Sequence, residues 1–308
     1  MGKTAFIFPG QGAQYCGMGK DFYEKFERAR RVYEIAGQAT GLDVAGLCFV
    51  ENDRLDVTEY TQIAMLATEV AILEVLREKG YQADCCGGLS LGEYGALAAA
   101  GVMELPDLFR LIRSRGIYMQ EAYPTGGAMT AVLGLDADTI RRICQETEGI
   151  VSIANDNCPG QIVITGEEAA VQKAADRLKE AGAKRCIPLK VSGPFHSVLL
   201  AGAGEKLGAE LERVEVKDPG IPYYSNVEAD PVTEKGRVKE LLTRQVSGTV
   251  RWREIMEHML EEGVDTFIEI GPGKTLTGFL RKMTRDVTMH NVATVEDLDL
   301  LDVWKKGR

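Results

Sequence analysis

Apolar strands and amphipathic helices alternate along the first 125 residues. The apolar run "KTAFIFPG" near the start predicts a buried strand, and the spacing of apolar residues predicts helices over residues 21–40 and 61–79. Another apolar strand leads into the turn at residues 88–92. Strands that alternate with helices in this way are typical of a mostly parallel sheet covered by helices.

The pattern changes at "YPTGGAM" and returns to helix and strand alternation after residue 193. Between these points the order is strand, helix, two strands around "NCPGQ", helix and strand, which predicts a ferredoxin-like unit with two helices on one antiparallel sheet. The sequence therefore predicts one domain formed by residues 1–125 and 194–308, with a ferredoxin-like subdomain inserted at 126–193. Residues 295–308 are expected to be a charged tail.

Composition narrows the class of protein. The chain has 308 residues, 45% of them hydrophobic, and a formal net charge of −10, which argues against nucleic acid as a partner. No apolar run is long enough for a membrane span, and Pro9 and Gly10 break the apolar start too soon for a signal peptide. The seven cysteines include no C-x-x-C pair, so reduced thiols and a cytoplasmic location are expected.

The segment "CCGGLSLGEYGAL" holds Ser90 within a G-x-S-x-G turn, between an apolar strand and an alanine-rich helix. In a nucleophile elbow, flanking glycines allow the strand to reverse tightly, so that the serine hydroxyl projects from the sheet edge. The helix start directs backbone N–H groups toward that oxygen. The alternative is a strand-to-helix turn that merely needs small residues.

A serine hydroxyl needs an adjacent base, most often a histidine, to act as a nucleophile at neutral pH. The chain has three histidines, far apart in sequence and without the spacing of a metal site. His258 points away from the apolar stripe of its predicted helix, and nothing around His290 suggests a site. His196, in "VSGPFHS" between a strand end and a helix, is the favoured base over a structural histidine.

An arginine falls on the apolar side of the predicted helix "LPDLFRLIRSRGIYMQEA". Arg115 lies near the centre of the apolar stripe, whereas Arg110 and Arg113 point outward. A buried guanidinium requires a carboxylate or several acceptors. The sequence leaves open whether that carboxylate belongs to the chain or arrives with a substrate.

Two glycine-rich segments imitate nucleotide-binding motifs. "GPGKT" at residues 271–275 lacks the first glycine of a phosphate loop, and "GQGAQY" has Tyr15 where a dinucleotide fingerprint has its last glycine. Nucleotide binding is therefore not expected at either. Both remain candidates for loops at sheet ends, where ligands approach the backbone.

Taken together, these motifs resemble those of the malonyl-CoA:acyl-carrier-protein transacylases. The resemblance covers essentially the whole chain, and the motifs occur in order: "FPGQGAQ", "GLSLGEY", "RSRGIYMQEA", "NDNCPGQIVITG", "VSGPFHS", "PYYSNV", "RQVSGTVRW" and "IEIGPGKTL". It implies an α/β-hydrolase-like core with a mostly parallel sheet and the ferredoxin-like insertion. It also implies transfer of a malonyl group from malonyl-CoA to the thiol of acyl carrier protein, with no metal or other cofactor, by a monomer.

The resemblance assigns roles position by position. Ser90 would be the acylated nucleophile, and His196 its base and acid. The main-chain carbonyl of Gln245 would orient the histidine in place of an aspartate. Backbone N–H groups of Gln11 and Leu91 would form the oxyanion hole.

Three further positions bear on the substrate and on activity. Arg115 would hold the malonyl carboxylate. The resemblance therefore favours a substrate, over the chain itself, as the source of the carboxylate that pairs with Arg115. Leu89 stands where many members of the family have a histidine, so any hydrogen bond from that position is absent; we take it as a tolerated variant. Phe195 either narrows the space for an α-methyl branch or packs in the core.

The sequence leaves three rival functions open. A serine hydrolase would use the same elbow and histidine, although an arginine at the pocket floor suits few ester substrates. A free-standing acyltransferase of a polyketide assembly line is hardly distinguishable from the fatty acid enzyme. A non-catalytic paralogue that binds carrier protein is supported only by Leu89.

Acyl carrier protein is acidic, and so is this chain, so docking requires a local basic patch. Lys184, Arg185 and Lys190, around the last strand of the predicted insertion, are the candidates. The ordinary alternative is that these residues are solvated surface charges.

Overall fold

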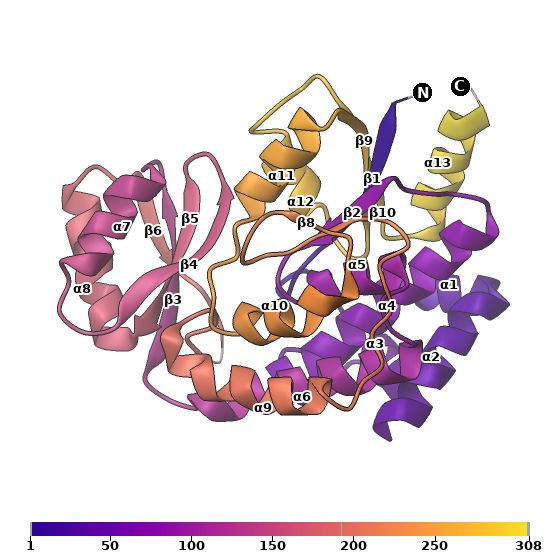
Figure 1. Ribbon diagram of the computed structural model, residues 1–308, viewed down its shortest axis with the longest axis horizontal. Helices are drawn as coiled ribbons and strands as arrows, with labels where there is room; N and C mark the ends of the chain where they lie inside the picture. Colours follow the sequence, from indigo (N-terminus) through magenta and orange to yellow (C-terminus); the bar gives the residue numbers. More distant parts are fainter. Residues whose placement is uncertain (1, 192, 307–308) are drawn as a thin grey trace.

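The computed structural model describes residues 2–191 and 193–306, arranged as a mixed α/β structure with two sheets (Figure 1). The larger sheet has the strand order β10-β9-β1-β2-β7-β8. Its neighbouring strands are parallel except for the β7–β8 pair, which is antiparallel. These strands are β1 (Lys3–Phe8), β2 (Cys85–Gly88), β7 (Tyr223–Tyr224), β8 (Pro231–Val232), β9 (Val264–Ile270) and β10 (Thr288–Val292).

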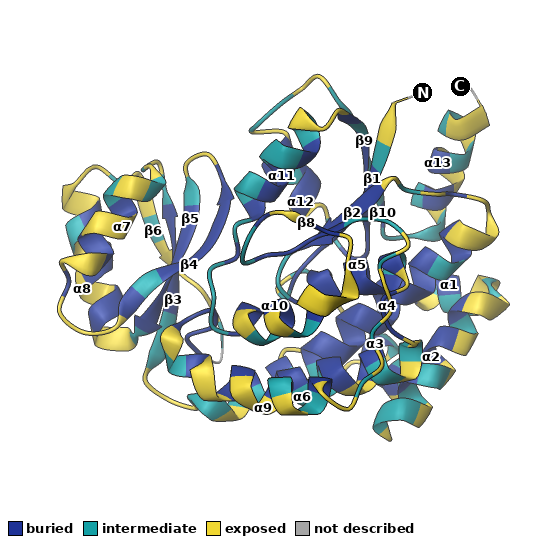
Figure 2. Ribbon diagram, viewed as in Figure 1, coloured by how far each residue is buried: buried dark blue, intermediate teal, exposed yellow. Residues whose placement is uncertain are grey.

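Helices cover both faces of this sheet, and strand β1 shows why. Phe6 and Phe8 belong to one apolar cluster, whereas Ala5 and Ile7 belong to another on the opposite face. Alternate side chains of a strand point to opposite faces, so a strand that is apolar throughout needs cover on both. The buried residues accordingly run through the centre of the larger sheet (Figure 2).

The larger cluster packs helices from both ends of the chain against one face. These helices are α1 (Lys20–Lys25), α2 (Glu27–Thr40), α3 (Val44–Phe49), α4 (Thr58–Glu78), α5 (Gly92–Ala100), α6 (Leu105–Ala122), α9 (Ala201–Leu211), α10 (Val238–Gln245) and α13 (Val295–Lys306). The other face is covered by α11 (Trp252–Glu261) and α12 (Thr275–Leu280). Short 3₁₀ turns occupy Val198–Leu200 and Lys235–Arg237.

The second sheet forms a separate lobe, at the left of Figure 1, which we call the four-stranded unit (residues 127–188). Its elements follow one another as β3 (Gly127–Leu133), α7 (Ala137–Gln145), β4 (Val151–Cys158), β5 (Gln161–Glu167), α8 (Glu168–Glu180) and β6 (Arg185–Pro188). The strand order is β4-β5-β3-β6, and every neighbouring pair is antiparallel. An apolar cluster that includes Val132, Ile140 and Val171 joins the sheet to its two helices.

The structure corrects two details of the sequence analysis. The helix expected over residues 21–40 is two helices, because Phe26 between them adopts an extended backbone. The expected charged tail is wrong for residues 295–306, which form helix α13. Leu298 and Leu301 of that helix are buried, and Asp302 accepts hydrogen bonds from Lys79 and Tyr81. The remaining tail residues lie outside the described part of the chain.

Across residues 2–191 and 193–306, no helix combines the length and the apolar character that crossing a membrane requires. All seven cysteines are free thiols.

Candidate active site

The turn between β2 and α5 places Ser90 in a strained backbone conformation. Ser90 has φ 57°, in the left-handed region that residues with a side chain rarely adopt. Both flanking glycines are required sterically, since a Cβ on Gly88 would lie 1.9 Å from the carbonyl oxygen of Gly92, and one on Gly92 would lie 2.2 Å from that of Phe8. The side chain of Asn226 holds the turn, accepting from the Ser90 N–H at 2.7 Å and donating to the Gly88 carbonyl at 2.7 Å.

His196 lies against the serine, held by backbone carbonyls. Its Nε2 is 2.7 Å from Ser90 Oγ, and its Nδ1 is 3.0 Å from the Gln245 carbonyl oxygen and 3.1 Å from that of Gly248. Carbonyl oxygens only accept, so Nδ1 carries the proton and Nε2 is free to accept one from the serine. Burial, and then the Arg115 charge, lower the pKa of His196 to about 4, which keeps the ring neutral at physiological pH.

Arg115, in α6, is the third residue at this point, and its side chain is only 1% exposed. Nη2 donates to Ser90 Oγ at 3.1 Å and to Gln245 Oε1 at 3.0 Å, while Nη1 donates to Gln62 Oε1 at 2.7 Å. Within the described residues, none of its hydrogen bonds goes to a carboxylate. Burial lowers the pKa of Arg115 from its usual value. A buried cation is thus solvated by neutral oxygens beside the serine.

A network of buried groups behind the serine fixes the side-chain amide of Gln245. The Nε2 of Gln245 donates to the Ser90 carbonyl at 2.7 Å and to Glu93 Oε2 at 2.9 Å, which turns its Oε1 toward Arg115. Glu93 also accepts from the backbone N–H of Asn226 at 3.2 Å. Burial is the main cause that raises the pKa of Glu93, to about 7.

Four residues of the site were not predicted from the sequence: Gln62, Glu93, Asn226 and Gly248. Glu93 stands three residues after the serine, where an acid also suits the first turn of any helix. The other three lie on distant segments, and no local pattern distinguishes them from ordinary polar residues or turn glycines.

A cavity of about 230 Å³ lies between the larger sheet and the four-stranded unit, and it is lined by Ser90, His196 and Arg115. Gln11 and Leu91 line it, as do residues from both glycine-rich segments that the sequence placed at sheet ends. Leu89 and Phe195 also line it, and Phe195 is buried as well, which fits both of its proposed roles. From the four-stranded unit, Met129, Asn155, Asn157 and Val163 form the opposite wall.

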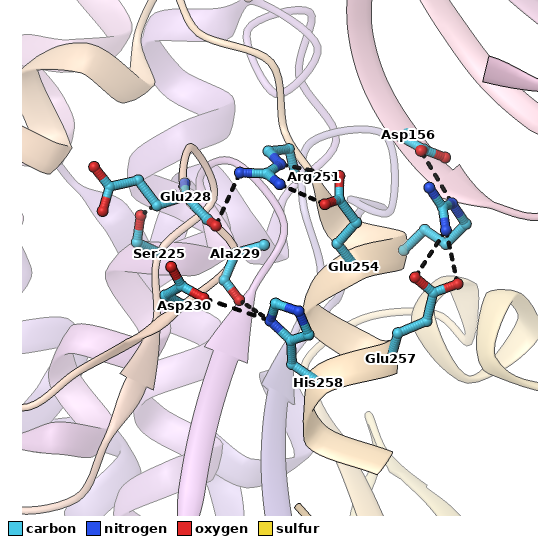
Figure 3. Close-up of polar contacts among 10 residues, drawn as sticks. Asp156, Ser225, Glu228, Ala229, Asp230, Arg251, Glu254, Glu257 and His258 are labelled. Carbon is cyan, nitrogen blue, oxygen red and sulfur yellow. Dashed lines mark hydrogen bonds and ion pairs between the residues drawn. The ribbon is translucent and has the colours of Figure 1, made fainter. Parts of the chain in front are cut away.

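The other two histidines lie elsewhere. His258 of α11 is partly exposed, and its Nδ1 donates to the Ala229 carbonyl at 2.8 Å (Figure 3). The ring of His290, in β10, contacts the ring of Trp304, with the centroids 4.4 Å apart and the two planes tilted by 58°.

The three basic residues proposed for docking are exposed, and Lys184 and Arg185 lie at or beside edge strand β6. Lys190 follows Leu189, which lines the cavity. Lys190 therefore lies next to the cavity wall, whereas Lys184 and Arg185 lie at the other end of β6, where Arg185 pairs with Leu133.

Comparisons with known proteins show the family of this chain. The family model described as "Acyl transferase domain" matches residues 5–307. A malonyl CoA-acyl carrier protein transacylase of Bacillus subtilis is 44% identical over 305 residues, covering 97% of this chain and 96% of the relative. The crystal structure of the transacylase of that name from Clostridium perfringens superposes with a TM-score of 0.95 at 42% identity, over 99% of this chain and 98% of that one.

A further solved structure is a malonyl-transacylase in complex with its type II PKS acyl-carrier protein. It matches with a TM-score of 0.93 at 40% identity, over 96% of this chain and 97% of that one. Near-complete coverage of both chains at such identities leaves no other family in question. The chain is an acyltransferase and belongs to the malonyl-CoA:acyl-carrier-protein transacylases.

Proposed function

We propose that this chain moves the malonyl group of malonyl-CoA onto the phosphopantetheine thiol of acyl carrier protein, through a malonyl ester of Ser90, and so supplies extender units for fatty acid biosynthesis. One observation carries the proposal: Ser90 Oγ contacts both the neutral His196 and the buried Arg115, which has no carboxylate partner among the described residues. A nucleophile, its base and a fixed cation within one small cavity suit an acyl group that ends in a carboxylate.

In the first half of the reaction, His196 Nε2 takes the hydroxyl proton of Ser90 while Oγ attacks the thioester carbonyl. The backbone N–H groups of Gln11 and Leu91 hold the tetrahedral oxyanion, each contributing about 10²–10³ in rate. Leu91 supports this role by its place at the start of α5, where backbone N–H groups are free of helical partners. Coenzyme A leaves with the proton from His196.

The second half repeats these steps with the carrier thiol. The thiol gives its proton to His196 and attacks the malonyl ester, and the proton returns to Ser90 Oγ as the ester bond breaks. The carbonyls of Gln245 and Gly248 hold the imidazole N–H throughout, in the place of a third catalytic carboxylate. No step uses a metal or a redox group.

Arg115 binds the malonyl carboxylate in this scheme. Its guanidinium now contacts neutral oxygens of Gln62, Gln245 and Ser90, and a charged carboxylate is a better acceptor than any of them. Binding therefore exchanges weak contacts for strong ones without moving the arginine far.

The finer architecture belongs to the same proposal. We assign residues 1–125 and 194–308 to an α/β-hydrolase-like domain and 126–193 to a ferredoxin-like insertion, supported by the order β4-β5-β3-β6 with antiparallel neighbours. Because every group used above comes from one chain, a monomer is sufficient. We place the enzyme in the cytoplasm, where acyl carrier proteins and their thioesters are used.

A polyketide pathway is the second candidate, favoured by the similarity to a transacylase solved with a type II PKS carrier protein. Both pathways use the same chemistry, so they differ in the carrier that docks. Comparing kcat/KM for a fatty acid carrier and a polyketide carrier separates them.

Intact-mass measurement tests the reaction itself. Mixing the protein with malonyl-CoA should add one malonyl group, absent in Ser90→Ala, and the group should leave when pantetheine or carrier protein is added. A hydrolase would release malonate without a thiol, and a non-catalytic paralogue would acquire no label. A label on a different serine would refute the assignment of Ser90.

A further inference from the structure

Strand β4 separates the catalytic cavity from a second cleft. Asn155 and Asn157 line the catalytic cavity, whereas Asp156 between them lines the second cleft, together with Arg251 and Glu254. This alternation follows from the two-residue period of a strand. A displacement of β4 would therefore move the wall of the catalytic cavity.

Asp156 connects that strand to helix α11. Its side chain is 9% exposed, and Oδ2 accepts from Arg253 Nε at 3.0 Å. Arg253 also contacts Glu257 of its own helix, whose two oxygens are each 2.7 Å from Nη1. Figure 3 labels the two acids, Asp156 of the four-stranded unit and Glu257 of α11. Burial raises the pKa of Asp156, and the Arg253 charge opposes that rise. Of the two ion pairs of Arg253, the one with Asp156 joins α11 to the four-stranded unit, and the one with Glu257 stays within α11.

Backbone hydrogen bonds join the same strand to the segment that holds the catalytic histidine. Val250 donates to the Ala154 carbonyl at 2.8 Å and accepts from the Asp156 N–H at 2.9 Å. Val250 lies two residues after Gly248, whose carbonyl accepts from His196. Ion pair and backbone bonds thus fasten β4 and the histidine support at one junction.

We propose that Asp156 and Arg253 form a latch that holds the Asn155–Asn157 wall closed and so keeps water away from the acylated serine. Both are positioning residues, since neither lines the catalytic cavity. Removing Arg253 leaves a buried carboxylate without its cation, and such a charge is costly unless it reaches water. An outward movement of β4 would bring the Asp156 carboxylate to water and lower that cost, and the same movement would open the Asn155–Asn157 wall.

The consequence follows from the chemistry of the malonyl-serine ester, so this inference rests on the proposed function. Water that enters can give a proton to His196 and attack the ester carbonyl. The bond between the carbonyl carbon and Ser90 Oγ then breaks, the proton returns to Oγ, and free malonate leaves. Hydrolysis competes with transfer to the thiol, and their ratio reports how well the wall excludes water.

The test measures malonate release and malonyl-pantetheine formation from the same malonyl-CoA-loaded enzyme. The interaction energy between coupled contacting residues corresponds to about 2- to 100-fold in an equilibrium constant or a rate. For Arg253→Gln we expect the ratio of hydrolysis to transfer to rise on the order of tenfold. The double variant Asp156→Asn with Arg253→Gln also lacks the ion pair, but it leaves no buried charge unpaired and keeps the backbone bonds to Val250. Its ratio should therefore lie between those of the wild type and of Arg253→Gln. Asp156→Asn alone is a milder second variant, for which the ratio of hydrolysis to transfer should rise less than for Arg253→Gln.

Glu257→Gln is the matched control, because it removes the other carboxylate of Arg253 without touching the contact to β4. Its ratio should stay at the wild-type value, and urea unfolding of each variant shows separately whether stability has changed. An unchanged ratio in Arg253→Gln, or a double variant as leaky as that single one, overturns the latch. Failure of the wild type to acquire a malonyl group would instead overturn the proposed function.

Discussion

Arg115→Ala is the change that most directly tests why this site is built around a cation. The arginine is 1% exposed and its described hydrogen bonds go to neutral oxygens, so its removal breaks no ion pair. It frees the side-chain oxygens of Gln62 and Gln245, at about 1–3 kcal/mol for each buried acceptor left unsatisfied. It also removes a buried charge, which offsets part of that cost. We therefore expect a modest loss of stability and a folded protein.

The expected effect on the reaction is larger. Malonyl differs from acetyl by one carboxylate, and a hydrogen bond between charged groups contributes about 1.5–3 kcal/mol. A two-pronged contact from one guanidinium then corresponds to about 10²–10⁴ in rate. Malonyl transfer should fall by that factor in Arg115→Ala, while acetyl transfer stays level or rises because it never used the contact.

The assay compares kcat/KM for malonyl-CoA and acetyl-CoA with one acceptor thiol. Arg115→Lys should recover little, because an ammonium lacks the planar fork. Arg113→Ala is the control on the same helix: Arg113 is paired with Glu59 at 2.8 Å and does not line the cavity. Equal losses of malonyl and acetyl transfer in Arg115→Ala, with unfolding at lower denaturant, would refute the reasoning and make Arg115 a structural residue.

The other predictions concern the base, the arginine's neighbour and the docking surface. The rate of acylation should stay level down to about pH 5 and fall as the pH passes about 4, because His196 serves as base only when neutral. The variant His196→Ala should lose about 10²–10⁴ in rate. A fall centred near pH 6.5 in stopped-flow acylation would contradict the buried, neutral ring. Gln62→Glu should place an internal carboxylate 2.7 Å from Arg115 and lower malonyl transfer more than acetyl transfer; unchanged selectivity would count against carboxylate binding there. Reversing the charges of Lys184 and Arg185 together should raise KM for carrier protein but not for pantetheine, and equal effects on both acceptors would exclude a docking patch.

The sequence predicted the larger elements of the fold because their apolar periods are strong. The buried strand β1, the long helix α4 and the element order of the four-stranded unit were all expected and are confirmed. Helix α13 was missed because charged residues dominate its composition, while its buried residues Leu298 and Leu301 form only a narrow stripe. The break at Phe26 was missed since the apolar pattern continues across it.

The candidate site likewise holds residues that could be predicted from the sequence and residues that could not. Ser90, His196 and Arg115 stand in local patterns with a chemical meaning, and the structure brings all three together. The hydrogen-bond partners of Arg115 stand in no such local pattern. Gln62 lies 53 residues before Arg115 and Gln245 lies 130 residues after it, so only the folded chain brings them together. A buried glutamine looks in sequence like any polar residue on a helix.

Those two glutamines explain how the site can hold a cation without neutralising it. A carboxylate at either position would pair with Arg115 permanently and leave nothing for a substrate to gain. An amide oxygen lowers the cost of burying the guanidinium but remains a weaker acceptor than malonate. The orientation of Gln245 is fixed from behind by the acceptors Glu93 and the Ser90 carbonyl, which leaves its Oε1 facing the arginine. The carboxylate of Glu93 is thus one residue removed from the cation, close enough to orient the network but not to take the place of the substrate.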